Sequence, residues 1–592
     1  MMMTRHLGLL LVGLLIAVGF ARAANAEVRA WDLHITANRT SIGEGGTIVV
    51  SARCTPSKSD ISKRVTGIVI WPYVNGKQWG AAEKTNRRGQ VKFMIPLPNV
   101  GTARIQVATQ GPSKADFPVG QLLPAGAIVS NSVEVHVLAR HFTVPAHRRH
   151  LVGIEYEPWF TPLNVTWNTA ESIPLMGKYS SLNPAVLRQQ ALWFDKMGIN
   201  YIIIDWSINL WGKNEWHQRT PNVTQRIAAT TLLLKTYVQM RRQGITTPEV
   251  TLLLGLNNAS AAPFKTTGLN GEIAWIYRKY IQNPLFSSLW LHYRNKPLIV
   301  IINIGGPRAL VDQPPINCQH FIVRWMATQL QIAPPLAHAG YWSWMDGSQS
   351  PIPTFSGGKC EALTITPAFF IFPKGGWLAA TARARDNGVT YIREFDTALR
   401  YRPHFLTICQ WNEFAGQPIG QGFGTKHDVY WDCYAVPLSN DIEPTSLTAC
   451  GYRGCGGWGF YYLNLTRAFV HLYHQKHPSS TILAIGSPDH NAVITGGSIP
   501  VRWACVGKQP QNFTLRLDGK VVARHIPPSR RAYTINLRGV APGRHTLTLR
   551  ANGAVSRFQI SYAHESRWLA QPIPAMAHIA FTLSGKQCKA PR

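Results

Sequence analysis

His404-Phe405-Leu406-Thr407-Ile408-Cys409-Gln410-Trp411-Asn412-Glu413-Phe414 joins an apolar run to a cluster of amide, aromatic and carboxylate side chains. A strand of a parallel sheet is covered on both faces, so its sequence is apolar throughout. In a barrel of alternating strands and helices, functional side chains follow the C-terminal ends of such strands. The stretch therefore predicts a buried parallel strand that ends at a functional loop, with Glu413 as its central candidate residue.

Seven similar apolar runs come earlier in the chain, and helical patterns separate most of them. The segment Pro184–Met197, for example, places Leu187, Ala191 and Phe194 at helical spacing. Eight strands over about 330 residues are typical of a (β/α)8 TIM barrel with long loops, which we expect over residues 148–478. The strands are expected at residues 152–156, 201–205, 250–256, 297–302, 321–325, 339–344, 362–367 and 404–408. An open doubly wound sheet is the alternative, but no Gly-rich phosphate loop follows the first strand.

Short β-type runs, separated by Gly, Asn and Pro turns, occupy residues 27–140 and 487–562. This pattern is typical of β-sandwiches. The predicted protein is therefore multidomain, with a central TIM barrel between two Ig-like β-sandwich domains. The N-terminal sandwich is expected to be a packing or spacer module, with sugar binding as the alternative, because a fold alone does not fix a function. Residues 565–592 are expected to form a loosely attached tail.

Residues 1–26 have the features of a secretory signal peptide. Arg5 and His6 precede an apolar run at residues 7–20, and small residues follow it up to Ala26, which fits cleavage after an Ala-x-Ala pattern. The run is too short for a spanning helix, and no later stretch reaches the length of about 18 apolar residues that a span needs. We expect a secreted or periplasmic protein with no membrane span; an uncleaved N-terminal anchor is the alternative.

The chain has nine cysteines, and an oxidising compartment would let some of them pair. Cys433, Cys450 and Cys455 lie close together in a Gly-rich region, so one disulfide is expected inside this group. Cys318 and Cys360 are candidates for a second disulfide. The cysteine spacings do not fit a zinc site, and the sequence predicts neither a metal nor a cofactor.

The net charge of +31 arises because acids are scarce: 29 Asp and Glu stand against 60 Lys and Arg. A nucleic-acid-binding protein usually gathers its basic residues in a patch or run, whereas here they are dispersed, so no nucleic-acid partner is expected. The remaining interpretations are an anionic partner, such as an acidic polysaccharide or the cell envelope, or life in an acidic medium.

Aromatic side chains stand beside carboxylates at the ends of four predicted strands, the first, second, sixth and eighth. Sugars fit such a combination, because the faces of a pyranose ring are apolar while its hydroxyls need fixed acceptors. Cleavage of a glycosidic bond also needs two groups, one that protonates the leaving oxygen and one that attacks, activates water or stabilises charge. We predict Glu413 as the first catalytic residue, with Asp205 and Glu157 as the leading second members, followed by Asp346. The predicted substrate-binding residues are Tyr156, Trp159, Trp206, Trp342, Trp344, Asp346, Trp411, Asn412 and Glu443.

Other interpretations of these residues exist. The carboxylates could be satisfied structural groups, and tryptophans taken singly are more often core residues than sugar platforms. Other hydrolytic chemistries lack their motifs: the sequence contains no Gly-x-Ser-x-Gly elbow between a strand and a helix and no His-Glu-x-x-His.

From Val152 onward the chain resembles the glycoside hydrolase family 99-like barrels, which include endo-α-mannosidases and related mannanases. The resemblance rests on residues 153–160, on residues 173–184 with the strand at 198–207, and on residues 411–413, which read Trp-Asn-Glu. It covers the barrel and neither flanking domain. It implies a retaining endo-glycosidase that acts with help from the 2-hydroxyl of the sugar, on a glycan or polysaccharide substrate.

The resemblance also implies two catalytic Glu residues in one loop, and here the chain departs from the pattern. Glu413 matches the first, but Gly416 stands at the second position. Another acid could fill the role, such as Glu443 in Asp441-Ile442-Glu443-Pro444. Alternatively the barrel uses a different mechanism, or it is a non-catalytic glycan-binding or cell-envelope protein. An insertion at residues 420–440 displaces the segment that carries Glu443 and is expected to form a lid.

Overall fold

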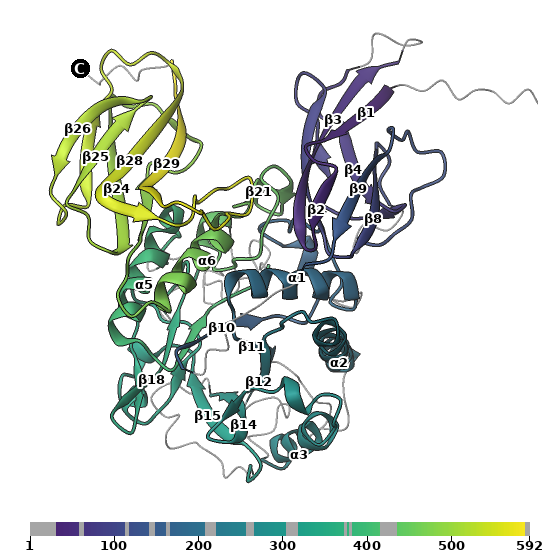
Figure 1. Cartoon of the computed structure of the whole chain (residues 1–592), viewed down its shortest axis with the longest axis vertical. Helices are drawn as coiled ribbons and strands as arrows, with labels where there is room; N and C mark the ends of the chain where they lie inside the picture. The colour runs from purple at the N-terminus through teal and green to yellow at the C-terminus, as the bar shows by residue number, and fades with distance from the viewer. Residues whose placement is uncertain are drawn as a thin grey trace, which may run out of the picture.

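The computed structural model consists of a central sheet of parallel strands with a β-domain before it and another after it (Figure 1). It describes residues 31–57, 64–112, 118–140, 149–160, 166–207, 221–255, 266–303, 318–371, 376–377, 382–414 and 435–585. The predicted signal segment and the predicted lid therefore lie largely or wholly outside the described residues. Within the described residues, no helix has both the length and the apolar character needed to cross a membrane.

The central sheet contains eight strands that pair in parallel, in the order β16-β15-β14-β12-β11-β10-β19-β18. All eight lie at or close to the positions that the apolar runs predict. The strands are β10 Leu151–Tyr156, β11 Tyr201–Trp206, β12 Glu249–Gly255, β14 Lys296–Ile302, β15 Ile322–Ala327, β16 Trp342–Ser343, β18 Lys359–Ile365 and β19 Phe405–Ile408. Two short antiparallel strands, β13 His292–Tyr293 and β17 Thr354–Ser356, extend it.

The sheet curls into a nearly closed barrel whose two end strands, β16 and β18, meet through side chains. Thr364 donates its hydroxyl to the carbonyl of Ser343 at 2.6 Å, and the Trp342 indole donates to Glu361 at 3.2 Å. Strand six is shorter than predicted over residues 339–344. Pro335 begins a one-turn helix that ends at His338, and Gly340 turns the chain with a φ of 85°, so only Trp342 and Ser343 remain for pairing.

The described residues contain six α-helices, one of which is a single turn, fewer than the eight of an idealised TIM barrel. The helices are α1 Pro184–Met197, α2 Pro221–Arg242, α3 Thr266–Ile276, α4 Pro335–His338, α5 Val389–Tyr401 and α6 Tyr461–Tyr473. The span of α1 agrees with the prediction because its boundary signals are strong. Asn183 caps its first turn through a 3.0 Å hydrogen bond from the Ala185 N–H, and Gly198 ends it in the left-handed region.

The N-terminal domain is a pair of sheets with a shared apolar core. One sheet has the order β1-β3-β7 and the other the order β2-β9-β8-β4-β5, with β6 beside β4. The strands are β1 Trp31–Ala37, β2 Ser41–Gly43, β3 Gly46–Pro56, β4 Val69–Val74, β5 Lys77–Gln78, β6 Glu83–Lys84, β7 Gln90–Leu97, β8 Gly101–Ala108 and β9 Val133–Leu138. The alternating burial of β3 and β7 puts every second side chain into that core, which is the pattern of a sandwich.

The C-terminal domain also has two sheets, ordered β22-β24-β27 and β23-β29-β28-β25-β26, around a core of its own. The strands are β22 Thr481–Ser487, β23 Ala492–Ile494, β24 Ser498–Gly507, β25 Asn512–Leu517, β26 Lys520–Ile526, β27 Ala532–Asn536, β28 Gly543–Ser556 and β29 Ile573–Leu583. Strand β29 lies in the segment predicted as a loose tail. It pairs with β28 along its whole length and buries Ile579 and Phe581, so this part of the segment belongs to the sheet.

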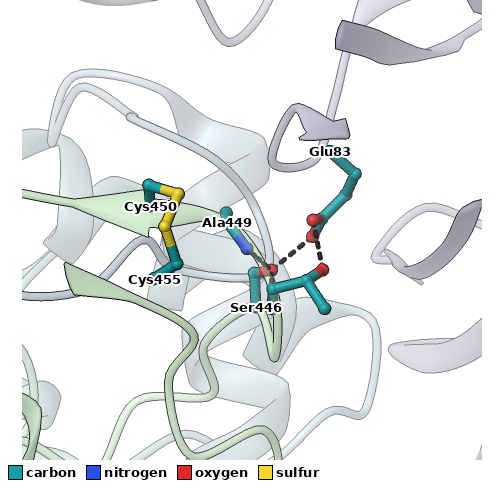
Figure 2. The surroundings of a disulfide bond; sticks show 6 residues. Glu83, Ser446, Ala449, Cys450 and Cys455 are labelled. Atoms are coloured by element: carbon teal, nitrogen blue, oxygen red, sulfur yellow. Dashed lines mark hydrogen bonds between the residues drawn. A yellow bond between two sulfur atoms is a disulfide. The ribbon is translucent and has the colours of Figure 1, made fainter. Parts of the chain in front are cut away.

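One disulfide joins Cys450 to Cys455 across the short hairpin of β20 Cys450–Gly451 and β21 Gly454–Cys455 (Figure 2). This confirms the bridge expected inside that group of cysteines. The second expected bridge is wrong, because Cys318 and Cys360 are both free. Glu361 points into the barrel, where its carboxylate accepts a 2.5 Å hydrogen bond from Arg324, so the preceding Cys360 side chain points to the opposite face of β18.

The segment before this hairpin connects the N-terminal domain to the barrel (Figure 2). Glu83 in β6 is 6% exposed and accepts hydrogen bonds from the hydroxyls of Ser446 and Thr448. The Ser446 hydroxyl in turn accepts the N–H groups of Thr448 at 3.1 Å and Ala449 at 2.9 Å. Burial raises the pKa of Glu83 from its ordinary value of 4.5 to about 7, although the two hydroxyls favour the charged form.

This raised pKa predicts a pH dependence of stability. Between pH 4.5 and about 7 the folded state binds more protons at Glu83 than the unfolded state does, so the free energy of unfolding falls as pH rises through that window and then levels off. Glu83→Gln keeps a neutral acceptor in place at every pH. We expect the variant to be more stable than the wild type by about 1–3 kcal/mol at pH 8 and to lose that advantage at pH 4. Denaturant unfolding at both pH values measures the difference, and a parallel pH profile for the two proteins would contradict the assignment.

Candidate active site

The candidate site lies at the C-terminal end of the barrel interior, where alternate residues of each strand point inward. In the lower part of the barrel this interior is packed. The Tyr201 ring fills the space beside Gly153, where a Cβ atom would collide with it, and the Tyr201 hydroxyl lies 2.8 Å from that of Thr407. Above this layer the inward positions of β10 and β11 carry Glu155 and Asp205, so the barrel changes from apolar to acidic towards its C-terminal end.

Glu157 and Asp205 form a hydrogen-bonded carboxyl pair at this end. Burial raises the pKa of Glu157 well above its ordinary value, and the negative charges of Asp205, Glu413 and Glu155 raise it further. The pKa of Asp205 is also raised by burial, but hydrogen bonds from Ser207, the charge of Arg226 and the hydrogen bond from Glu157 oppose the shift. Burial and the neighbouring negative charges thus favour the protonated form of Glu157, whereas the hydrogen bonds and Arg226 favour the charged form of Asp205.

Arg226 supplies the positive charge of the cluster from helix α2. Its side chain is buried, and burial lowers its pKa while Asp205 and Glu157 oppose the shift. The guanidinium lies over the ring of Trp159, with 5.8 Å between its central carbon and the ring centroid. This contact places Trp159 beside the acidic cluster, as the sequence predicts for a residue of the site.

Glu155 is a further buried acid inside the barrel. Burial raises its pKa well above the ordinary value, the charge of Asp205 raises it further, and the neighbouring Cys409 thiol and Trp344 indole oppose the shift. Trp344, a predicted site residue, therefore lies next to the acidic cluster. Glu155 is not among the predicted site residues, although its parity with Glu157 along β10 places both on the inward face.

Glu413 is held at the end of β19 by the segment 439–441. Its backbone N–H donates to Asp441 at 2.5 Å, and the Phe414 N–H donates to the other Asp441 oxygen at 3.0 Å. Its side chain is 5% exposed and accepts a hydrogen bond from the Gln410 amide. The charges of Glu413 and Asp205 both contribute to the raised pKa of Glu157, so the three predicted catalytic groups lie close enough together for their charges to interact.

Asn412 connects the ends of β10 and β19, after which Glu157 and Glu413 stand. Its amide oxygen accepts the N–H of Glu157 at 2.8 Å, and its amide nitrogen donates to the carbonyl of Glu157 at 3.1 Å. The same nitrogen donates to the Tyr179 hydroxyl at 3.0 Å. Asn412 is thus a positioning residue for Glu157, and its side chain is wholly engaged with protein groups rather than open to a substrate.

Glu443 faces away from the carboxyl cluster, towards helix α1. It accepts hydrogen bonds from the Tyr179 hydroxyl at 2.7 Å and from the Gln190 amide at 3.3 Å, and it is fully buried. Burial raises its pKa from 4.5 to about 8, opposed by those two donors. The Tyr156 hydroxyl donates to Gln190 at 2.9 Å in the same network. Tyr156 and Glu443 therefore belong to a polar layer between barrel and helix.

Tyr179 is the centre of that layer, which makes its hydroxyl a sharp test of the network. It donates to Glu443 and accepts from Asn412 and Gln190. Tyr179→Phe leaves these three buried partners without it, and we expect a loss of about 1–3 kcal/mol in the free energy of unfolding. Tyr391→Phe is the matched control, since its buried hydroxyl bonds a single side chain, Thr466, at 3.1 Å. Equal destabilisation of the two variants in denaturant titrations would contradict the network.

Four further predicted binding residues contact helices, the packed barrel interior or backbone N–H groups, away from the carboxyl cluster. The Trp206 indole donates to Thr230 of α2 at 3.0 Å, and the Trp411 ring packs on Phe194 of α1 with 4.7 Å between centroids. Trp342 lies in the packed lower interior with Phe405. The carboxylate of Asp346 accepts the N–H groups of Ile352 at 2.7 Å and Leu330 at 3.2 Å, while burial raises its pKa to about 6. The structure does not bring these four to the cluster of Glu157, Asp205 and Glu413.

The segments that follow six of the strands lie outside the described residues, and one of them contains Gly416. They comprise residues 161–165, 208–220, 256–265, 304–317, 372–375 and 415–434. Among the residues that the structure does describe, no group of three or more His, Cys, Asp and Glu side chains is arranged to hold a metal ion.

No family model matches the chain, and no curated protein does. Among solved structures, the chain is similar to the GH99 endo-alpha-mannosidase from Bacteroides thetaiotaomicron, at 14% identity and a TM-score of 0.36 over 56% of this chain and 98% of that one. It is also similar to an endo-beta-1,4-mannanase from Thermotoga petrophila, at 9% identity and a TM-score of 0.34 over 74% of this chain and 99% of that one. A beta-glucuronidase from Bacteroides uniformis is similar at 10% identity and a TM-score of 0.33, over 93% of this chain and 61% of that one.

These three neighbours, a mannosidase, a mannanase and a glucuronidase, are glycoside hydrolases. Similarity at this level carries nothing about individual residues, so the interpretation of the site rests on the carboxyl cluster itself. Membership of the family 99-like barrels stays a prediction.

Proposed function

We propose that this chain is an exported glycoside hydrolase, secreted or periplasmic, that cleaves within a polysaccharide or glycan chain. The observation that carries the proposal is the carboxyl cluster, in which Glu157 and Asp205, both with raised pKa values, stand beside Glu413 at the C-terminal end of a barrel-like sheet. The proposal includes a TIM-barrel scaffold of the family 99-like type with an Ig-like domain on each side.

The proposed chemistry divides the two tasks between these groups. The Glu157–Asp205 pair supplies a proton to the glycosidic oxygen as its bond to the anomeric carbon breaks, which a carboxyl group can do at neutral pH only if its pKa is raised. Glu413 serves the anomeric side, where a carboxylate attacks, activates a nucleophile or stabilises positive charge. Water then adds to the anomeric carbon and returns a proton to the carboxyl groups. Trp159 and Trp344, which lie next to the cluster, are the proposed sugar contacts.

The test is a substrate screen with the purified full chain. α-Mannan, β-mannan and other neutral glycans form one arm and acidic polysaccharides the other, with reducing ends and product sizes measured by chromatography. Release of oligosaccharides supports endo action, and release of monosaccharides alone contradicts it.

A second candidate function is a non-catalytic glycan-binding or cell-envelope protein on a degenerate hydrolase barrel. Two observations favour it: Gly416 stands where the resembled family has its second Glu, and Glu443, the substitute acid, faces α1 instead of the cluster. Glycan binding without any release of reducing ends would favour this candidate over hydrolysis.

A further inference from the structure

A cavity of about 860 Å³ lies where the N-terminal domain, the barrel helices and the segment after β28 meet. Its walls include the 38–49 region of the N-terminal domain, residues of α1 and α6, and residues 563–568. The barrel interior lies on the other side of α1, so this cavity is separate from the carboxyl cluster. Its volume falls within the range of about 300–1,000 Å³ that is usual for sites of small organic ligands.

The lining of this basic cavity is strongly cationic. Among the described residues that line it, five are Arg or Lys and one is a carboxylate, Glu565. The cations are Arg39, Arg140, Lys196, Arg467 and Arg567. A second acid, Asp195, lies close behind them, and its pKa is raised to about 7 by burial against the opposing charges of Arg140, Lys196 and Arg467. The five cations therefore outnumber the nearby carboxyl groups.

The inner wall of the basic cavity is rigidly built. Lys196 is buried and makes an ion pair with Glu565 at 3.0 Å, and the Trp193 indole donates to the same carboxylate at 2.9 Å. Asn464 of α6 accepts the Ser566 N–H at 2.7 Å and donates to the His564 carbonyl at 2.9 Å. The segment 563–568 is thereby fixed to both helices, and Lys196 keeps its position without a ligand.

The excess positive charge of the basic cavity affects the cations that line it. Burial lowers the pKa of Lys196, Glu565 opposes the shift, and the charges of Arg140 and Arg467 lower it further. Because Glu565 is already engaged with Lys196, an added anion would reduce the mutual repulsion of these cations.

An exposed aromatic ring completes the wall. Trp568 is 47% exposed, although large apolar side chains are usually covered. Its indole contacts the rings of Phe558 and His471, with centroid distances of 5.5 and 4.4 Å, and the Arg557 guanidinium lies 5.1 Å from its centroid. A fixed, half-exposed indole beside arginines offers an apolar platform next to anion-binding groups, a combination found at the strongest contacts of binding sites.

We propose that the basic cavity binds an anionic sugar chain, with the acidic groups of the chain on the arginines and one of its rings on Trp568. The cationic lining of the cavity is by itself the reason to expect an anionic ligand. The choice of a sugar chain rests on the proposed function, because a second site that holds a polymer next to the barrel would keep an acidic polysaccharide attached between cleavage events. A carboxylate or sulfate group satisfies the geometry equally well.

The experiment measures binding to the full chain by isothermal titration calorimetry. The probes are polygalacturonate oligomers, dextran sulfate oligomers, neutral mannan oligomers and single-stranded DNA, each at low and high salt. Arg39→Glu/Arg567→Glu reverses two exposed lining charges, and Trp568→Ala removes the platform. Arg538→Glu/Arg550→Glu makes the same change of net charge on exposed arginines of the C-terminal domain, and Tyr452→Ala removes another exposed aromatic.

We expect the acidic oligomers to bind, the neutral ones to bind at least about tenfold more weakly, and high salt to weaken the binding. Each cavity variant should lose about tenfold or more in affinity, while the two controls keep it. Unchanged affinity in both cavity variants, or equal losses in the controls, would overturn the assignment. DNA that binds as tightly as polygalacturonate and responds to the same variants would overturn the identification of the ligand as a sugar chain.

The outcome is separable from that of the proposed function. Binding is measured without turnover, and Glu413→Gln should leave it unchanged. Failure to cleave any glycan in the screen therefore leaves the binding result intact, and failure to bind leaves the cleavage result intact.

Discussion

Glu413→Gln is expected to reduce the release of reducing ends from the best substrate of the screen by about 10²- to 10⁴-fold in kcat, the contribution usual for a catalytic acid or base. Glutamine keeps the size of the side chain but can neither attack nor take up a proton. The backbone N–H groups of residues 413 and 414 still reach Asp441, so the fold should be intact. Kinetics on purified protein, together with thermal unfolding, check both statements.

Glu249→Gln is the matched control for this substitution. Glu249 begins strand β12, at the N-terminal end of the barrel, and its side chain faces Arg241 and His292. We expect its kcat to stay within about twofold of the wild type, because surface-type substitutions away from the reacting groups change little. Undiminished turnover by Glu413→Gln would remove Glu413 from the mechanism, whatever the control does.

Arg385→Ala is expected to cost about 3–5 kcal/mol of unfolding free energy, the largest stability effect that the described structure predicts. The Arg385 side chain is 3% exposed and donates to the backbone carbonyls of Ser439 and Asp441. Its guanidinium lies over the rings of Trp458 and Tyr462, 3.8 and 4.2 Å from their centroids. Removing it leaves buried carbonyls without donors and takes away the cation that opposes the burial of the Asp441 carboxylate.

Asp441 explains why this loss should reach the candidate active site. Its charge acts on the buried Glu171, whose pKa is raised well above its ordinary value by burial and by Asp441, and it holds the backbone of Glu413. Arg385→Lys is not expected to rescue stability, since an ammonium lacks the planar fork that meets two carbonyls and two rings at once.

Arg383→Ala is the control for Arg385→Ala. Arg383 lies two residues away and makes a partly exposed ion pair with Asp386 at 2.9 Å, a type of contact worth about 0–1 kcal/mol. Urea unfolding followed by tryptophan fluorescence measures all three variants. A midpoint for Arg385→Ala equal to that of Arg383→Ala would show that the buried guanidinium contributes little.

Most of the parallel strands of the barrel could be predicted because their sequences are mainly apolar runs with a clear end. The strand after Val152 and the strand before Glu413 needed no knowledge of their partners. Strand β29 was missed, since Pro574 and three alanines dilute its alternation and its stability comes from β28. The sixth strand was predicted too long because Pro335 and Gly340 act through local backbone geometry that apolarity does not reveal.

Only the acidic residues of the candidate site could be predicted from the sequence. Positions at strand ends pointed to Glu157, Asp205 and Glu413, and the structure groups these three. Aromatic residues at the same ends divide: Trp206 has the outward parity of β11 and bonds to α2, while Trp411 lies beyond the end of β19 and packs on α1. Arg226 could not have been found from strand ends, because it reaches the cluster from α2. The orientation of Glu443 depends on Tyr179 and Gln190, which lie more than 250 positions away in the chain.

The clamp of Asn412 on the backbone of Glu157 has a consequence for how such an enzyme could diversify. The separation of two catalytic carboxyl groups decides whether a glycosidase inverts or retains the configuration of the anomeric carbon. Here the chain segments that carry Glu157 and Glu413 are joined by a pair of hydrogen bonds between the ends of two adjacent strands. In the proposed enzyme, substitutions that alter which glycan is accepted but keep these two hydrogen bonds would leave the stereochemistry of the product the same.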